Sequence, residues 1–263
     1  MTKKRHIHTR LIALIILPLF MLGVLLANPI GADAASNKQI TMDKEVIASG
    51  TKYATNLYII DSGKPGPVVL IVGGVHGNEI AGVEAAYKSK EIEINKGKLL
   101  VLPEANKRSV EIERRFVPGE EDLNREFPRT SNGNPSGTLA TAIWDEVIEE
   151  YEIDWLMDLH EGFDYHKNPD TNSVGQTIIY YPARGARTYV LNIADELNKD
   201  ISREREQFTV IRNPVRGSLA RSAAELHEIN AFIFESTMRD NLSTRVNYQM
   251  TSVNSLLEQL DMI

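Results

Sequence analysis

The sequence predicts an α/β fold in which a central, mostly parallel mixed sheet lies between two layers of helices, forming a three-layer sandwich. Two observations predict it. Short apolar runs bounded by glycine, proline or polar residues alternate with longer segments of helical periodicity, as in βα units. No internal repeat and no linker-like stretch interrupts this alternation, so we expect one domain over residues 35–263.

The apolar runs are short and rich in Val, Ile, Leu and aromatic residues, as strands are. The predicted strands cover residues 53–60, 68–72, 98–103, 154–160, 177–181, 208–211 and 231–234, after a polar lead-in. Apolar residues three or four apart predict helices over residues 78–90, 136–151, 186–199, 219–229 and 244–260. Residues 104–135 follow neither pattern, and we expect a long loop there, which in a compact domain is typically functional or disordered.

The first 34 residues have the features of a secretory signal peptide. The basic start contains Lys3, Lys4, Arg5 and Arg10. Residues 11–27 are nearly uninterrupted apolar sequence, and Ala32-Asp33-Ala34 supplies a small-x-small cleavage site. We therefore expect a secreted protein that begins at Ala35 and has no stable membrane association after cleavage. The alternative is an uncleaved membrane anchor, because the apolar stretch is close to the shortest that can span a bilayer.

Charge and cysteine content exclude several classes of function. The whole chain has a formal net charge of −7. The leader contains the four basic residues and one acid, Asp33, so its removal changes the net charge to −10, which argues against a nucleic-acid partner. The chain has no cysteine, which excludes thiolate metal sites and cysteine nucleophiles. Any metal must be held by histidine and carboxylate side chains.

A predicted strand-to-helix turn carries the first candidate metal ligands. The turn, Gly73-Gly74-Val75-His76-Gly77-Asn78-Glu79, follows the apolar run 68–72, at the strand end where open α/β sheets place their sites. His76 and Glu79, three residues apart at a helix start, can direct an imidazole nitrogen and a carboxylate oxygen to one point, as two zinc ligands would. The flanking glycines permit a sharp turn and leave room for another group to approach. By itself this pair does not establish a metal site.

A second histidine follows a buried strand in the same way. His160 ends the run 154–160, and if the strands are parallel it lies at the same sheet edge as His76. The alternative is a histidine that is hydrogen-bonded at the rim of the sheet. Asp158 points to the same side of the strand as His160. It could orient a ligand imidazole or cap a neighbouring backbone group. The remaining histidines are His6 and His8 in the leader, and His166 and His227, which we expect to be ordinary surface or helix residues.

Two further polar segments are candidates for chemistry. The apolar residues 231–234 lead directly into Glu235, so burial should raise the pKa of its carboxyl unless a cation or water pairs with it. A carboxylate near an activated water serves as general base and acid in metal-assisted hydrolysis, although Glu235 could also turn to solvent. Asp122-Leu123-Asn124-Arg125, with Arg114-Arg115 upstream, places an arginine fork beside an amide, which suits a substrate carboxylate. Such a charged run can equally be a solvated loop.

Taken together, these segments resemble the succinylglutamate desuccinylase/aspartoacylase family, a branch of the zinc carboxypeptidase superfamily. The matching segments are Gly74–Glu79, Asp122–Arg125, Asp158–His160 and the strand that ends at Glu235, in order between about residues 67 and 236. The resemblance implies a zinc-carboxypeptidase-like sandwich that binds one Zn²⁺ per chain. It implies His76, Glu79 and His160 as the three zinc ligands, with an open coordination position.

The resemblance also implies roles for the polar residues around that ion. Glu235 is implied as the catalytic base that deprotonates the water and then protonates the leaving amine. Arg125 is implied to polarise the scissile carbonyl, and Arg115, Asn124 and Arg125 to bind the substrate carboxylate. Asp122 is implied as the partner of the first ligand histidine.

The sequence departs from the family in three respects. The segment between Arg115 and Asp122 is slightly longer than usual, so Arg114 could replace Arg115. Residues 236–238 match nothing in the family, and we expect no carboxyl-terminal β-domain of the kind that narrows the aspartoacylase pocket. An export signal is also unusual, and it argues against cytoplasmic metabolites such as N-succinylglutamate or N-acetylaspartate as substrates.

These inferences predict a secreted zinc hydrolase that cleaves an amide bond next to a free carboxylate. Two activities remain open: a deacylase of N-acylated amino acids, and a carboxypeptidase with peptides such as those of the cell wall as substrates. The alternative class is a non-catalytic protein of the same fold that binds a carboxylate ligand.

Overall fold

The computed structural model describes residues 40–182 and 185–263. The predicted signal peptide, residues 1–34, lies outside the described residues. Within the described residues, no helix has both the length and the apolar character needed to cross a membrane. The described residues form one compact unit.

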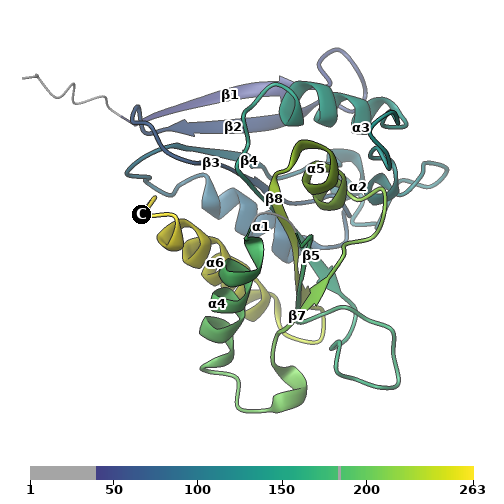
Figure 1. The fold of residues 1–263 in the computed structure, drawn as a ribbon. Helices are drawn as coiled ribbons and strands as arrows, with labels where there is room; N and C mark the ends of the chain where they lie inside the picture. Colours follow the sequence, from purple (N-terminus) through teal and green to yellow (C-terminus); the bar gives the residue numbers. More distant parts are fainter. Residues whose placement is uncertain (1–39, 183–184) are drawn as a thin grey trace, which may run out of the picture. The chain divides into compact units, whose positions relative to one another are not determined.

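A mixed eight-stranded sheet forms the centre of the described structure, with the strand order β1-β2-β4-β3-β5-β8-β6-β7 (Figure 1). The strands are β1 (Thr41–Ile47), β2 (Thr55–Asp61), β3 (Val68–Val72), β4 (Lys98–Leu102), β5 (Trp155–Gly162), β6 (Thr177–Tyr180), β7 (Thr209–Arg212) and β8 (Asn230–Thr237). The four central strands, β4, β3, β5 and β8, are parallel to one another. Antiparallel pairs attach β2 on one side and β6 on the other. The predicted mixed sheet is thereby confirmed.

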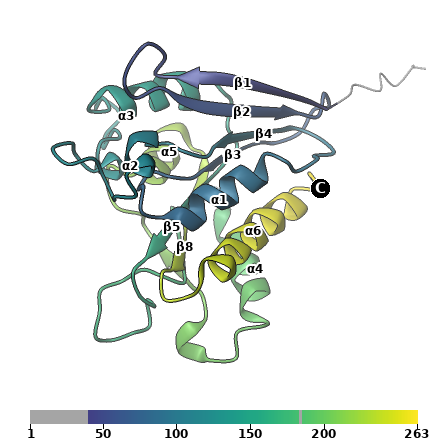
Figure 2. The ribbon, with the colours of Figure 1, turned by 180° about the vertical axis from the view of Figure 1, so that it is seen from behind.

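Helices cover both faces of the sheet. One face carries α3 (Thr138–Ile143), its π-helical continuation η2 (Trp144–Ile148) and α5 (Leu219–His227), seen in front of the sheet in Figure 1. The opposite face carries α1 (Ile80–Ser89), α4 (Ala186–Asn198) and α6 (Leu242–Gln259). Of these helices, α1 and α6 come to the front in Figure 2. The three predicted layers are therefore present.

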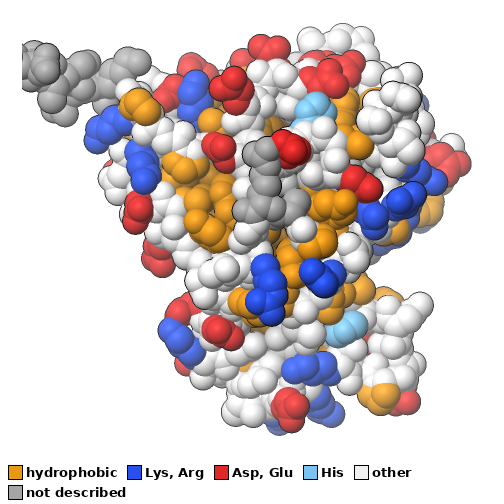
Figure 3. Space-filling view, viewed as in Figure 1, with side chains coloured by type: hydrophobic (Ala, Val, Ile, Leu, Met, Phe, Trp, Pro, Cys, Tyr) orange, Lys and Arg blue, Asp and Glu red, His pale blue; other side chains and the backbone are white. Residues whose placement is uncertain are grey.

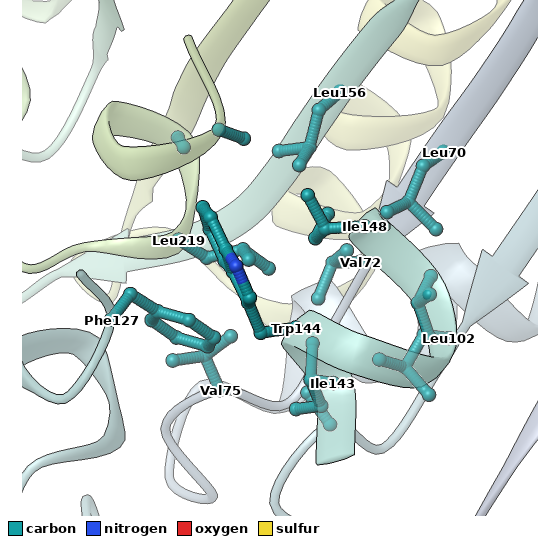
Figure 4. Close-up of a cluster of buried hydrophobic side chains, with 14 of the residues drawn as sticks. Leu70, Val72, Val75, Leu102, Phe127, Ile143, Trp144, Ile148, Leu156 and Leu219 are labelled. Carbon is teal, nitrogen blue, oxygen red and sulfur yellow. The ribbon is translucent and has the colours of Figure 1, made fainter. Parts of the chain in front are cut away.

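Side-chain alternation along the strands produces two separate cores. Leu70, Val72 and Leu156 pack with Trp144 and Leu219 on the α3/α5 face (Figure 4). The intervening residues of the same strands face α1, α4 and α6. Because successive strand residues point to opposite faces, strands buried on both sides are apolar throughout, and this is why they were visible in the sequence. On the face in Figure 3, apolar side chains gather near the middle, with Lys and Arg below them.

Several boundaries differ from the sequence prediction. The lead-in contains strand β1, which was missed because it is an exposed edge strand with polar residues on both faces. The predicted loop 104–135 contains the short helix α2 (Lys107–Glu111) and the 3₁₀ turn η1 (Leu123–Arg125), and η3 (Glu204–Glu206) is a further 3₁₀ turn. The predicted helix 136–151 is α-helical only at its start and continues as η2.

Strands β5 and β8 are both longer than predicted, and this difference bears on the site. They pair in parallel register through His160 and Glu235 and on to Gly162 and Thr237. The prediction that His160 and Glu235 end their strands is therefore wrong by two residues. The pairing continues because the polar residues beyond them are buried, as described below. His160 and Glu235 consequently lie on regular strand backbone, side by side.

Candidate active site

His76, Glu79 and His160 form one buried cluster at the carboxyl edge of the parallel strands. His76 Nδ1 is 2.7 Å from Glu79 Oε1, and His160 Nδ1 is 2.8 Å from Glu79 Oε2. The two Nδ1 atoms are 3.2 Å apart. Three potential ligand atoms from three points in the chain therefore converge on one small volume, as the sequence predicted.

A carboxylate lies behind each of the two imidazoles. Asp122 Oδ1 is 3.0 Å from His76 Nε2, and Asp158 Oδ2 is 3.0 Å from His160 Nε2. Asp122 accepts a hydrogen bond from His76 Nε2, and the Asp158 carboxylate is close enough to attract a proton to His160 Nε2, so Nδ1 of each ring is the nitrogen directed at Glu79. Of the two possibilities for Asp158, orientation of the imidazole is the one that fits. Asp122 occupies the place that the family resemblance implies for it.

The electrostatics of the cluster are those of a site built for a cation. Burial acts to raise the pKa of the Glu79 carboxyl, but the two adjacent histidines outweigh it and hold that pKa well below its usual range. Burial acts to lower the pKa of His160, but Asp158 and Glu79 outweigh it and raise that pKa well above its usual value. Asp122 likewise has a lowered pKa, because His76 and Arg115 counteract its burial. The Glu79 and Asp122 carboxylates therefore stay ionised despite their burial, as carboxylates beside a bound cation must.

The residues present fit a zinc ion. Two donors that each lie about 2 Å from a tetrahedral zinc are about 3.3 Å apart, close to the spacing between the two Nδ1 atoms. Two imidazoles and one carboxylate are a donor set of catalytic zinc sites. The carboxylates at Nε2 are the outer partners that such ligand histidines have. Among the described residues this is the one group of His and acidic side chains that meets the spacing for a shared ion.

The turn between β3 and α1 positions the first two residues of the cluster. Gly74 has φ +68°, a left-handed conformation that glycine adopts without strain, so the expected sharp turn is present. The room at Gly77 is filled by protein, because a Cβ there would lie 2.0 Å from the Ser109 backbone of α2. In the first turn of α1, a Cβ at Gly82 would lie 2.5 Å from the Leu159 carbonyl oxygen. Glycine therefore allows α1 to lie directly on β5, next to His160.

Glu235 lies beside the cluster, on the cavity-facing side of β8. It is the register partner of His160 in the parallel β5–β8 pair, so both side chains project from the same face. Glu235 is 8% exposed, and the alternative that it turns to solvent is wrong. Burial, followed by the nearby carboxylates of Glu79 and Asp158, raises the pKa of Glu235 well above its usual value, although His160 and Arg115 oppose this. Its carboxyl thus holds a proton to a higher pH than an exposed glutamate does.

The predicted arginine and asparagine residues line the same cavity. Arg115 donates to Asp122 Oδ2 at 2.9 Å and lies 3.6 Å from Glu79. Arg125 Nη1 donates to the Asn124 carbonyl oxygen at 2.7 Å. Asn124 is buried, and its Oδ1 accepts the Leu219 amide at the start of α5 at 3.3 Å. Arg115 rather than Arg114 therefore belongs to the cavity wall.

The cavity itself has a volume of 710 Å³ and extends beyond the charged centre. Its floor includes Ile233, Ile179 and Ile211, which are register partners on the neighbouring strands β8, β6 and β7. Since Ile233 is two residues before Glu235, this apolar row lies about 7 Å along the sheet from the charged centre. Arg212 also lines this cavity. Sequence reasoning missed these residues, because the strands could be recognised but their neighbours in the sheet could not.

Neither of the other two described histidines belongs to the cluster. His227 packs edge-on against Trp144, with ring centroids 5.0 Å apart, and His166 approaches the Ser173 carbonyl oxygen at 3.3 Å. Both are ordinary residues, as expected.

The eight-stranded sheet between two helical layers is a zinc-carboxypeptidase-like α/β fold. Within that fold class, residues 65–174 match the family model described as the Succinylglutamate desuccinylase/Aspartoacylase catalytic domain. The match confirms the family resemblance that the sequence motifs indicated. No curated protein matches the chain.

Solved structures of the same fold include the cell shape determinant Csd4 of Helicobacter pylori. Csd4 with a bound tripeptide is 19% identical, with a TM-score of 0.64 over 86% of this chain and 56% of that one. Another Csd4 structure, with bound mDAP, is described as a D,L-carboxypeptidase. A succinylglutamate desuccinylase/aspartoacylase from Rhodobacter sphaeroides is 18% identical, with a TM-score of 0.60 over 86% of this chain and 66% of that one. The chain thus spans little more than half the length of Csd4, and at these identities the likeness concerns the fold.

Proposed function

We propose that the protein is a zinc-dependent hydrolase that cleaves an amide bond adjacent to a free carboxylate. The observation that carries this proposal is the convergence of two imidazole nitrogens and the Glu79 carboxylate, with Glu235 in register beside them. A zinc ion held by His76, Glu79 and His160 would polarise the scissile carbonyl and activate a water. The match to a family of catalytic domains supports the same reading.

The chain's own residues would then divide the remaining work. Glu235 takes a proton from the attacking water and later gives it to the leaving amine, for which its raised pKa is suited. Arg125 presents a guanidinium to the cavity, where it stabilises the negative charge that develops on the carbonyl oxygen. Arg115 and Asn124 hold the substrate carboxylate, and Asp122 and Asp158 keep both imidazoles oriented.

Among amide substrates, we favour short peptides with a free carboxyl end. A cavity of 710 Å³ with an apolar floor offers more space and more apolar surface than an acetyl or succinyl amino acid would use. Csd4, a protein of the same fold, was solved with a bound tripeptide. A deacylase of N-acyl amino acids is the second candidate, favoured by the family whose model matches residues 65–174. Secretion, proposed from the leader sequence, would make cell-wall peptides accessible.

The decisive experiment combines metal analysis with a substrate panel. We expect one zinc per purified chain, and release of an amino acid from short L- or D-peptides with a free carboxyl end, read by mass spectrometry. N-Acyl amino acids in the same panel test the deacylase. If the zinc-loaded protein binds carboxylate ligands but hydrolyses none of the panel, the non-catalytic binding protein replaces this proposal. If no divalent metal binds at all, the metallohydrolase is refuted.

A further inference from the structure

A buried polar network lies behind the metal cluster, on the face of the sheet that α1 and α6 cover. Its centre is Glu161, whose side chain is 0% exposed. Glu161 Oε1 accepts from Arg245 Nη1 at 2.6 Å and from Ser236 Oγ at 3.3 Å. Glu161 Oε2 accepts the Ala81 backbone amide at 3.0 Å. The carboxylate is thus satisfied from α6, β8 and α1 at once.

This network reaches Glu79 from two sides. Glu79 occupies the position before α1, where its own side chain does not cap the helix. Glu161 fills that role from a neighbouring strand, because it accepts the free Ala81 amide in the first turn. The Glu161 backbone amide, in turn, donates to Glu79 Oε2 at 3.1 Å. The same residue therefore fixes both the helix start that carries Glu79 and one oxygen of its carboxylate.

Helix α6 supports the ends of β5 and β8 as well. Gln249, one turn after Arg245 and fully buried, donates from Nε2 to the His160 carbonyl oxygen at 3.2 Å and to Ser236 Oγ at 3.0 Å. Ser236 directly follows Glu235 in β8. Arg245 thus contacts the residue after His160. Gln249 contacts the backbone of His160 and the residue after Glu235.

We propose that Glu161, paired with Arg245, is a positioning residue of the metal site that acts on Glu79, and that α6 is for this reason a functional part of the site. The proposal rests on the proposed metal site. A buried ion pair is a poor means of gaining stability, because the loss of hydration offsets most of the attraction, and apolar residues of similar volume do as well. We infer that the ion pair serves instead to hold the Glu79 carboxylate in contact with His76 and His160.

The test is the zinc affinity of Glu161→Gln and Arg245→Met, measured by competition with a chromophoric chelator. Glutamine keeps the volume of Glu161, but it replaces one acceptor oxygen with an NH₂ that faces the donors of Arg245 or Ala81. We expect each variant to bind zinc roughly 10- to 100-fold more weakly than wild type, the usual effect of removing an outer partner of a metal ligand. The double variant should be no weaker than the worse single one, because Arg245 acts through Glu161. Arg245→Lys, which keeps the charge, should restore part of the affinity.

A matched control separates positioning from general stability. Arg221 and Glu225 form an ion pair at 2.9 Å on α5, and the Arg221 side chain is 17% exposed, against 16% for Arg245. Arg221→Met should leave zinc affinity within about twofold of wild type, whatever it does to the melting temperature of the zinc-free protein.

Wild-type affinity in both Glu161→Gln and Arg245→Met would overturn the proposal, as would an equal loss in Arg221→Met. If Glu161→Gln does not fold, Arg245→Met and its lysine counterpart decide the question. A wild-type protein that binds no zinc refutes the proposed function instead, so the two failures are distinguishable.

Discussion

Replacing Glu235 with glutamine should lower the catalytic activity without lowering the stability of the zinc-free protein. The substitution keeps the shape of a side chain that is 8% exposed and removes its ability to take and return a proton. Loss of a general base and acid should lower kcat/KM roughly 100- to 10,000-fold. This corresponds to about 2.7–5.5 kcal/mol of activation free energy.

The expected effect on stability follows from the sign of the pKa shift. Burial and the neighbouring Glu79 and Asp158 raise the pKa of Glu235 above its ordinary value of 4.5, so the folded state disfavours the ionised form. The zinc-free wild type therefore loses stability as pH rises from about 4.5 to the raised pKa. Glutamine carries no charge and has no such penalty. At pH values above that range, the melting temperature of the zinc-free variant should therefore equal or exceed that of zinc-free wild type.

The assay is kcat/KM on the best substrate of the panel, together with melting curves of zinc-free wild type and variant between pH 4 and pH 8. Zinc content, measured in parallel, should be unchanged, because Glu235 is outside the ligand set. Activity within tenfold of wild type would remove Glu235 from the proton transfer. A lower melting temperature across the whole pH range would show that its carboxylate stabilises the fold, contrary to the argument.

Three further substitutions test the remaining parts of the site. Asp158→Asn should weaken zinc binding roughly 10- to 100-fold by chelator competition, because the asparagine no longer fixes the proton on Nε2 of His160; unchanged affinity would mean that Asp158 does not orient the imidazole. Arg125→Met should lower kcat/KM by about 10- to 100-fold, the value of a charge-assisted hydrogen bond, and an unaffected rate would remove Arg125 from oxyanion stabilisation. Ile211→Ala should reduce kcat/KM about tenfold for substrates with a large apolar group and leave small ones unchanged, whereas equal effects on both would exclude contact with the apolar floor.

The cluster could be predicted from the sequence because its members lie just after the apolar part of a strand that is buried on both faces. Such strands are continuous apolar runs, so His76, His160 and Glu235 stand out where the runs become polar. Parallel strands bring these ends to one edge, and the prediction needed only the strand direction, not their order in the sheet.

The supporting network and the substrate floor could not be predicted in this way. Arg245 and Gln249 stand among polar residues of an amphipathic helix, where nothing distinguishes a buried arginine from a solvated one. The row of Ile179, Ile211 and Ile233 exists only through the pairing of three strands that are far apart in sequence. Sequence spacing carries information along one element, whereas these features depend on which elements are neighbours.

Successive residues at the end of β5 point to opposite faces of the sheet, so site residues and the residue that supports them lie on one strand. Asp158 and His160 point to the cavity face, beside Glu235, whereas Glu161 points to the opposite face, toward Ala81 and Arg245. A slip of one residue in the β5–β8 register would exchange these faces and bury the imidazole of His160 against α6. The buried Glu161 network opposes such a slip, because it would leave an arginine and a helix amide without their acceptor. The ion pair that holds Glu79 in place therefore also specifies the register that brings His160 and Glu235 together.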